Sequence, residues 1–145
     1  MKKKKMSIIA IIAILAVSGG TYGVIQHNNE VQAQQKQESL IKKEKKNLES
    51  ASSAVNLAYE TRDSKDIETA NEAIDKLSNN QKEDKTELSK KMSKLDSLLK
   101  QLAEINTAIE KANKSKTDAD ITSVQTLLNK ITDDYLQNDK KTLQN

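Results

Sequence analysis

The residues able to carry out catalysis or to bind a metal ion are few in this sequence and stand far apart. His27 is the only histidine and there is no cysteine, which excludes a histidine pair for a metal and a thiolate nucleophile. Because His27 would stand alone beside the membrane, we interpret it as an exposed linker residue and expect no Ser-His-Asp set. Glycine occurs only at Gly19, Gly20 and Gly23, which leaves no glycine-rich phosphate loop further along. We therefore expect no enzyme activity, no cofactor and no small-molecule substrate.

Two pairs of acidic residues offer the oxygen ligands that calcium ions prefer. Asp118 with Asp120 and Asp133 with Asp134 lie close together in the sequence, but they lack the glycine-containing loop and the ligand spacing of a calcium site. At the start of a helix, a carboxylate more simply accepts hydrogen bonds from free backbone N–H groups. We expect these acids to act as helix caps and predict no metal site.

The basic residues do not form a nucleic-acid interface. The formal charge is +3, but Lys2 to Lys5 account for the excess and the rest of the chain is close to neutral. Aromatic residues, which stack on bases, are only 2% of the chain, so we predict no nucleic-acid partner. The run Lys42-Lys-Glu-Lys-Lys46 either contacts anionic lipid or wall polymers or forms the solvated face of a helix, and the second interpretation is favoured.

The N-terminus has the pattern of an export segment. Lys2, Lys3, Lys4 and Lys5 precede the apolar run from Ile8 to Val17, and such lysines stay on the cytoplasmic side of the membrane. We therefore predict that these lysines orient the chain in the membrane, and that residues 1–25 are a signal peptide or a transmembrane anchor.

The residues that follow this apolar run permit both an anchor and a cleaved signal. The uncharged stretch from Ser7 to Ile25 approaches the roughly 20 residues that a spanning helix needs, which favours an anchor. Small residues also stand at possible cleavage positions, Ala16 with Ser18 or Val31 with Ala33. Because no cysteine can take a lipid, a lipoprotein is excluded.

Past this segment, the composition predicts an all-α fold. Proline is absent and no glycine follows residue 25, so the turns that an antiparallel sheet requires have no suitable residues. Leu, Ile, Val, Met and Ala form the apolar set, which favours packing of helix on helix. We expect a polar stalk, or the frayed start of a helix, over 26–37 and an extracellular helical domain over 38–145.

Apolar spacing and helix-start signals predict the individual helices. Stripes of apolar residues with helical period indicate helices over 38–61, 67–77, 84–112 and 117–131. Asp63 with Asp66, and Asp84 with Glu87, stand in positions that resemble capping boxes. Asp120 follows Thr117 at the start of the last helix.

The apolar stripes recur in the same order. When Ile41 is placed on Leu95, the apolar positions of 41–77 fall on those of 95–131 without a gap, which indicates an internal duplication. The first copy and the start of the long helix then form an antiparallel three-helix bundle of spectrin-like kind, and the second copy is an incomplete unit. The apolar stripe left open predicts a candidate interface of Leu127, Ile131, Tyr135 and Leu136. In the alternative, the C-terminal tail folds back and Leu127, Tyr135 and Leu136 cover the stripe.

The repeated pattern resembles helical repeat modules of surface and secreted proteins of Gram-positive bacteria. The matching residues are Ala54-Val55 with Ala58 and Asp66-Ile67 with Ala70, Ile74 and Leu77, and then Ala108-Ile109 with Ala112 and Asp120-Ile121 with Val124, Leu128 and Ile131. The resemblance implies adhesion, spacing or ligand binding and no catalysis. This chain lacks the C-terminal wall-sorting signal of such proteins, so we expect the N-terminal segment to do the anchoring.

These observations predict a structural or interaction protein of the cell membrane. It would cross the membrane once, with its C-terminus outside, and would bind a protein partner or a second copy of itself. The alternatives are a cleaved and secreted helical effector, or an accessory component of a secretion or conjugation apparatus.

Overall fold

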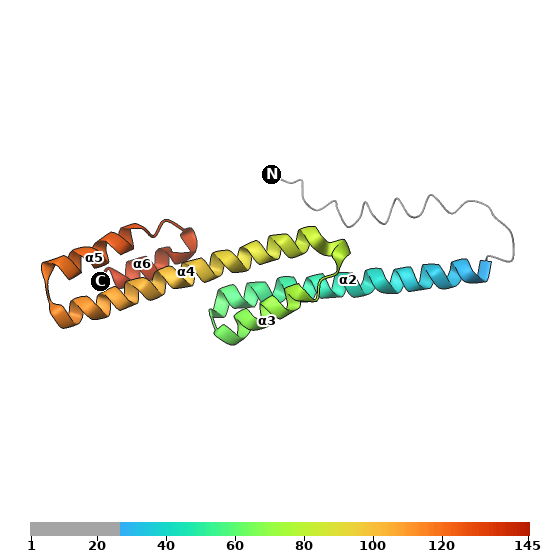
Figure 1. The fold of residues 1–145 in the computed structure, drawn as a ribbon, viewed down its shortest axis with the longest axis horizontal. Helices are drawn as coiled ribbons and strands as arrows, with labels where there is room; N and C mark the ends of the chain where they lie inside the picture. Colours follow the sequence, from blue (N-terminus) through green and yellow to red (C-terminus); the bar gives the residue numbers. More distant parts are fainter. Residues whose placement is uncertain (1–26) are drawn as a thin grey trace. The chain divides into compact units, whose positions relative to one another are not determined.

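The computed structural model describes residues 27–145, with side chains from Glu30 onward. The basic start and the apolar run predicted as an export segment lie outside these residues. Every regular element in the described part is a helix, which confirms the all-α prediction. The elements are α2 (His27–Thr61), α3 (Ser64–Asp75), the short 3-10 helix η1 (Asn79–Gln81), α4 (Lys82–Ser115), α5 (Asp118–Asn129), the 3-10 helix η2 (Asp134–Leu136) and α6 (Gln137–Leu143) (Figure 1).

Helix α2 begins earlier than the apolar spacing predicts. It starts at His27 and runs for 35 residues to Thr61, so the segment predicted as a stalk is helical from that point. The reason is local, because this segment holds no glycine or proline and is rich in Gln, Glu, Lys and Ala, which favour a helix without any partner to pack on. None of the helices in 27–145 has the length and apolar character needed to cross a membrane.

Two turns of the chain have the same backbone geometry. Helix α2 ends before Arg62 and helix α4 before Lys116, and these two residues have φ angles of 57° and 53°. The N–H of Arg62 donates to the Ala58 carbonyl at 2.9 Å, and that of Lys116 to the Ala112 carbonyl at 2.8 Å. A left-handed residue in this position is ordinarily glycine, so each turn keeps a side chain at some conformational cost.

The helix starts after these turns also correspond. Asp63 caps α3 by accepting from the Lys65 N–H at 2.8 Å, and Thr117 caps α5 by accepting from the Asp120 N–H at 3.4 Å. The predicted cap at Asp63 is therefore confirmed, whereas α5 is capped by Thr117 and not by the acids Asp118 and Asp120 that were expected to cap it. Asp66 does not complete a capping box, because its carboxylate accepts from the Thr61 hydroxyl at 2.7 Å.

The predicted start of α4 at Asp84 is wrong. The helix begins at Lys82, directly after η1, and Asp84 lies in its first turn. The chain reverses through η1, where the Gln81 N–H donates to the Ser78 carbonyl at 3.0 Å. In η2 the Leu136 N–H donates to the Asp133 carbonyl at 3.1 Å, so α4 and α6 follow similar turns.

Buried apolar residues form two clusters along α4, which packs against α3 and against α5 (Figure 1). The first cluster joins α2, α3 and the start of α4, and its buried members are Ala51, Val55, Ala58, Ala70, Ile74, Leu77, Leu88, Met92 and Leu95. The second cluster joins the rest of α4 with α5 and the C-terminal tail, and its buried members are Leu98, Leu102, Ile105, Leu128, Ile131 and Leu136. Tyr135 packs against both clusters.

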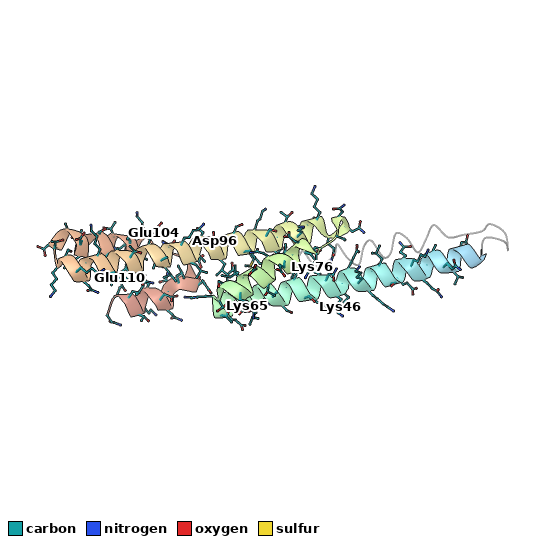
Figure 2. All side chains as sticks on the ribbon, turned by 60° about the horizontal axis from the view of Figure 1, so that its bottom comes forward. Lys46, Lys65, Lys76, Asp96, Glu104 and Glu110 are labelled. Atoms are coloured by element: carbon teal, nitrogen blue, oxygen red, sulfur yellow. The ribbon has the colours of Figure 1, made fainter. Side chains whose placement is uncertain are left out.

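Charged side chains occupy the opposite faces of the helices. This separation of apolar and charged faces is what burial of one stripe per helix requires. The side chains labelled in Figure 2 are all exposed and project away from the packed faces: Lys46, Lys65, Lys76, Asp96, Glu104 and Glu110.

Candidate interaction site

The predicted interface residues do not lie together on the surface. Ile131 and Leu136 are 1% and 0% exposed and belong to the second cluster, while Leu127 and Tyr135 are partly buried against it. The chain turns back through η2, so the tail covers part of the α4–α5 hairpin. Ile131 and Leu136 are thus used inside the fold, as the fold-back alternative expected.

Tyr135 lies at the centre of a polar and aromatic cluster that the sequence analysis did not identify. Its ring meets the ring of Tyr59 edge-on, with centroids 5.3 Å apart and planes at 71°. Its hydroxyl donates to the Tyr59 carbonyl and accepts from Arg62 Nε at 2.9 Å. The Arg62 guanidinium also lies 4.6 Å from the centre of the Tyr135 ring, within range of a cation–π interaction.

Arg62 also binds Asp139 of α6 through two parallel hydrogen bonds. Arg62 Nη1 donates to Asp139 Oδ1 at 2.8 Å and Nη2 to Oδ2 at 2.9 Å. This bidentate geometry is the strong form of an ion pair. The hydrogen bond from Arg62 lowers the pKa of the Asp139 carboxyl, and the same bond raises the pKa of Arg62. We call Tyr59, Arg62, Tyr135 and Asp139 the tyrosine clamp.

A second ion pair lies next to the tyrosine clamp. Lys94 Nζ is 2.7 Å from Asp133 Oδ2, and Asp133 Oδ1 accepts from the Tyr135 N–H at 3.0 Å. The hydrogen bond from Lys94 lowers the pKa of Asp133. Asp133 therefore caps η2, as expected for this acid, and its ion pair with Lys94 holds η2 against α4.

The tyrosine clamp has the features of a structural joint, because its members bind one another. Arg62 stays protonated, and burial raises the pKa of the Tyr59 hydroxyl, which donates to the Lys91 carbonyl at 2.7 Å. The two tyrosine hydroxyls and the Arg62 guanidinium all have hydrogen-bond partners within the protein. The cluster joins the α2–α3 turn to the C-terminal tail.

A composition signal could have revealed the tyrosine clamp. Arg62 is the only arginine in the sequence, and it binds Tyr135, on which a second of the three tyrosines, Tyr59, packs. Arginine differs from lysine in its planar, bidentate binding of carboxylates and its stacking on aromatic rings. A single arginine in a lysine-rich chain therefore points to a site where that geometry is used, although its partner cannot be read from spacing.

The acids considered as calcium ligands make other contacts. Asp120 accepts from Lys111 at 2.8 Å, from the Ser115 hydroxyl at 2.5 Å and from the Thr117 hydroxyl at 3.0 Å. These bonds, that of Lys111 first, lower its pKa to about 2. Among residues 27–145 no three metal-binding side chains stand close enough together to hold an ion.

The basic run after Ile41 is mostly solvent-exposed. Lys45 and Lys46 are exposed, whereas Glu44 is partly buried and accepts from the Ser78 hydroxyl at 2.6 Å and from Asn80 Nδ2 at 3.0 Å. The side-chain amide of Gln81, a buried polar residue, donates to the Glu44 carbonyl at 2.8 Å. Glu44 thus ties the η1 turn to α2, a role that the charge pattern did not predict.

An open groove lies between α4 and α5, beyond the end of α6. Its volume is 530 Å³, within the range of ligand-binding pockets. The polar residues of its lining are all Asn or Gln, so the groove carries no charge. Its apolar lining residues are Ile109, Ala112, Ile121, Val124, Leu128 and Leu143. We call this the α4–α5 groove.

The geometry above must carry the functional argument by itself. Comparison of the chain with protein-family models, with curated proteins and with solved structures finds no match.

Proposed function

We propose that this chain is a membrane-anchored extracellular helical protein whose function is to bind a protein partner at the cell surface. The observation that carries the proposal is the repeated helical hairpin, in which one copy has a closed apolar face and the other an open groove. The lysine-rich start and the uncharged run to Ile25 support the anchor, with the C-terminus outside.

The repeated hairpin supports the interpretation of an internal duplication with spectrin-like bundles. The paired left-handed turns at Arg62 and Lys116, the caps at Asp63 and Thr117, and the 3-10 turns before α4 and α6 recur in one order. A heptad periodicity shared by all the helices does not by itself produce three such local features in the same order. In this proposal α4 is shared between two consecutive bundles.

The tyrosine clamp supports a role as a stiff connector. Most of the stability of a helix in a protein comes from packing of its apolar face, and α4 packs on both clusters along its length. The Arg62–Asp139 pair joins the α2–α3 turn to α6, and the neighbouring Lys94–Asp133 pair joins η2 to α4. A partner bound in the α4–α5 groove would then be held in a fixed relation to the first cluster.

A cleaved and secreted effector is the alternative function, favoured by the small residues at Ala16 and Ser18. The second possible cleavage position, Val31 with Ala33, lies inside helix α2. The experiment that separates anchor from effector is the mass and N-terminal residue of the protein from its own cells. An intact Met1 in the membrane fraction supports the anchor. A shortened chain in the medium refutes it.

A further inference from the structure

The two clusters differ in how completely the same positions are covered. In the first cluster Val55, Ala58 and Ala70 are buried, and Met92 and Leu95 of α4 belong to the same buried cluster. The corresponding positions of the second copy are Ile109, Ala112 and Val124, which are only partly buried. Ile121, which corresponds to Ile67 of the first copy, is 46% exposed. The α4–α5 groove is therefore the second copy of a face that is closed in the first.

The first cluster shows what closes such a face. After the η1 turn, α4 places Leu88, Met92 and Leu95 in the first cluster, with Leu99 partly buried beside it. After the η2 turn, α6 begins in the same way, and Leu143 takes the position that Leu88 has in α4. In the structure helix α6 ends at Leu143, which lines one end of the groove, and the rest of the groove is open.

We propose that the α4–α5 groove binds an amphipathic helix of a protein partner, whose apolar residues have the spacing of Leu88, Met92, Leu95 and Leu99. The helix would lie where α6 would run if it continued past Leu143. The inference rests on the proposed function as a protein-binding chain and names the site and the class of partner.

The chemistry of the groove fits a helix with an apolar stripe and a neutral border. Because the polar lining residues are Asn and Gln, binding would depend on apolar burial and change little with salt. Asn113 stands where the first copy has Tyr59, whose hydroxyl donates to the Lys91 carbonyl of the covering helix at 2.7 Å. The Asn113 amide offers a donor at the same place.

A second folded copy is a poor source for this helix. In each chain Leu88, Met92 and Leu95 are already buried in the first cluster, and their exposure would require that cluster to open. A separate partner has no such cost. The groove is therefore assigned to a different protein that presents a helix of this pattern.

A peptide with the sequence of residues 82–101 of this chain is the direct probe. Labelled with fluorescein, it is titrated with the full chain in non-ionic detergent, with empty micelles as a blank, and anisotropy reports binding. We expect saturable binding that the Ile121→Asp variant weakens at least about tenfold, a change of 1.4 kcal/mol. A peptide with Met92→Asp and Leu95→Asp should not bind.

Leu57→Asp is the matched control for the groove variant. Leu57 is 45% exposed and Ile121 46%, so both variants replace a half-exposed apolar side chain, but only Ile121 lines the groove. Equal binding by wild type and Leu57→Asp, at unchanged circular dichroism, supports the assignment. No saturable binding by wild type, or equal loss in both variants, overturns it. A homodimer that Ile121→Asp dissociates also overturns it and assigns the groove to a second copy.

The outcome of the peptide-binding experiment does not depend on whether the chain is anchored in the membrane or secreted, so the two proposals can fail separately. If the peptide fails to bind while the membrane-bound chain keeps Met1, the anchor stands and only the groove assignment fails. If the peptide binds but the native chain is found shortened in the medium, the groove assignment stands and the anchor fails.

Discussion

Arg62 and Asp139 stand 77 positions apart in the sequence, and their side chains meet in a bidentate ion pair with bonds of 2.8 and 2.9 Å. The pair fastens the C-terminal helix to the turn between α2 and α3. It also explains why a chain otherwise provided only with lysine contains an arginine at this position.

Replacement of Asp139 by Asn should lower the free energy of unfolding by about 1 kcal/mol, because the ion pair is partly buried and bidentate. The side chains of Arg62 and Asp139 are 30% and 27% exposed, whereas Asp96, paired with Lys100, is 61% exposed. Asp96→Asn is therefore the control and should change stability much less. Urea unfolding followed by circular dichroism measures both, and equal effects would speak against a clamp.

Acid should weaken the fold through Asp120. Its pKa is lowered from 3.8 to about 2 by Lys111, Ser115 and Thr117, so the ionised carboxylate stabilises the folded chain. This stabilisation is complete above about pH 4 and is lost as the pH falls towards about 2. We expect the urea midpoint to fall over this window, and to fall less in Asp120→Asn. Carbon NMR of the Asp120 carboxyl measures its pKa directly, and a pKa at the ordinary value of 3.8 would exclude the effect.

Glycine should have opposite effects at the two left-handed turns. Lys116→Gly removes the steric cost of a Cβ at φ 53° and should stabilise the chain by up to about 1 kcal/mol. Arg62→Gly relieves the same cost but deletes the bonds to Tyr135 and Asp139, so it should destabilise. Thermal unfolding of both variants tests the difference, and a loss of stability in Lys116→Gly would be inconsistent with the turn geometry.

Replacement of Leu136 by Ala should lower the free energy of unfolding strongly, although Leu136 lies in a short C-terminal tail. The side chain is 0% exposed in the second cluster, and Leu→Ala at such a site costs about 2–5 kcal/mol. Leu57→Ala is the control, because Leu57 is 45% exposed and surface substitutions usually change stability by about 0.5 kcal/mol or less. Proteolysis of the tail in the Leu136 variant should increase as well. A mild effect at Leu136 would mean that the tail is loosely held.

Most of the helical framework could be predicted from the sequence, because apolar spacing and turn residues act locally. The stripes through Ile74 and Leu128 and the cap at Asp63 are found where the spacing indicates. For residues 26–37 the sequence left a stalk and the start of a helix both open, because apolar periodicity gives no signal for a helix formed by polar residues. The start of α4 was misplaced because the chain reverses in a 3-10 turn before Asp84.

The candidate site was harder to predict, because it depends on residues distant in sequence. The duplication indicated an open face in the second copy, but Ile131 and Leu136 were assigned to it and are buried. The groove lies further along, at Ile109, Ile121 and Val124, since the tail covers the near end of the hairpin. How far a tail reaches along a hairpin is set by tertiary packing and not by periodicity.

The central claim, a chain anchored by its N-terminus with the helices outside the cell, can be tested by cysteine labelling, since the sequence has no cysteine of its own. Leu57→Cys and Ser7→Cys variants are treated with a membrane-impermeant maleimide, on intact and on permeabilised cells. The account predicts labelling of Leu57→Cys on intact cells, and of Ser7→Cys only after permeabilisation, both on membrane-bound protein that keeps Met1. Labelling of Leu57→Cys only after permeabilisation would contradict it.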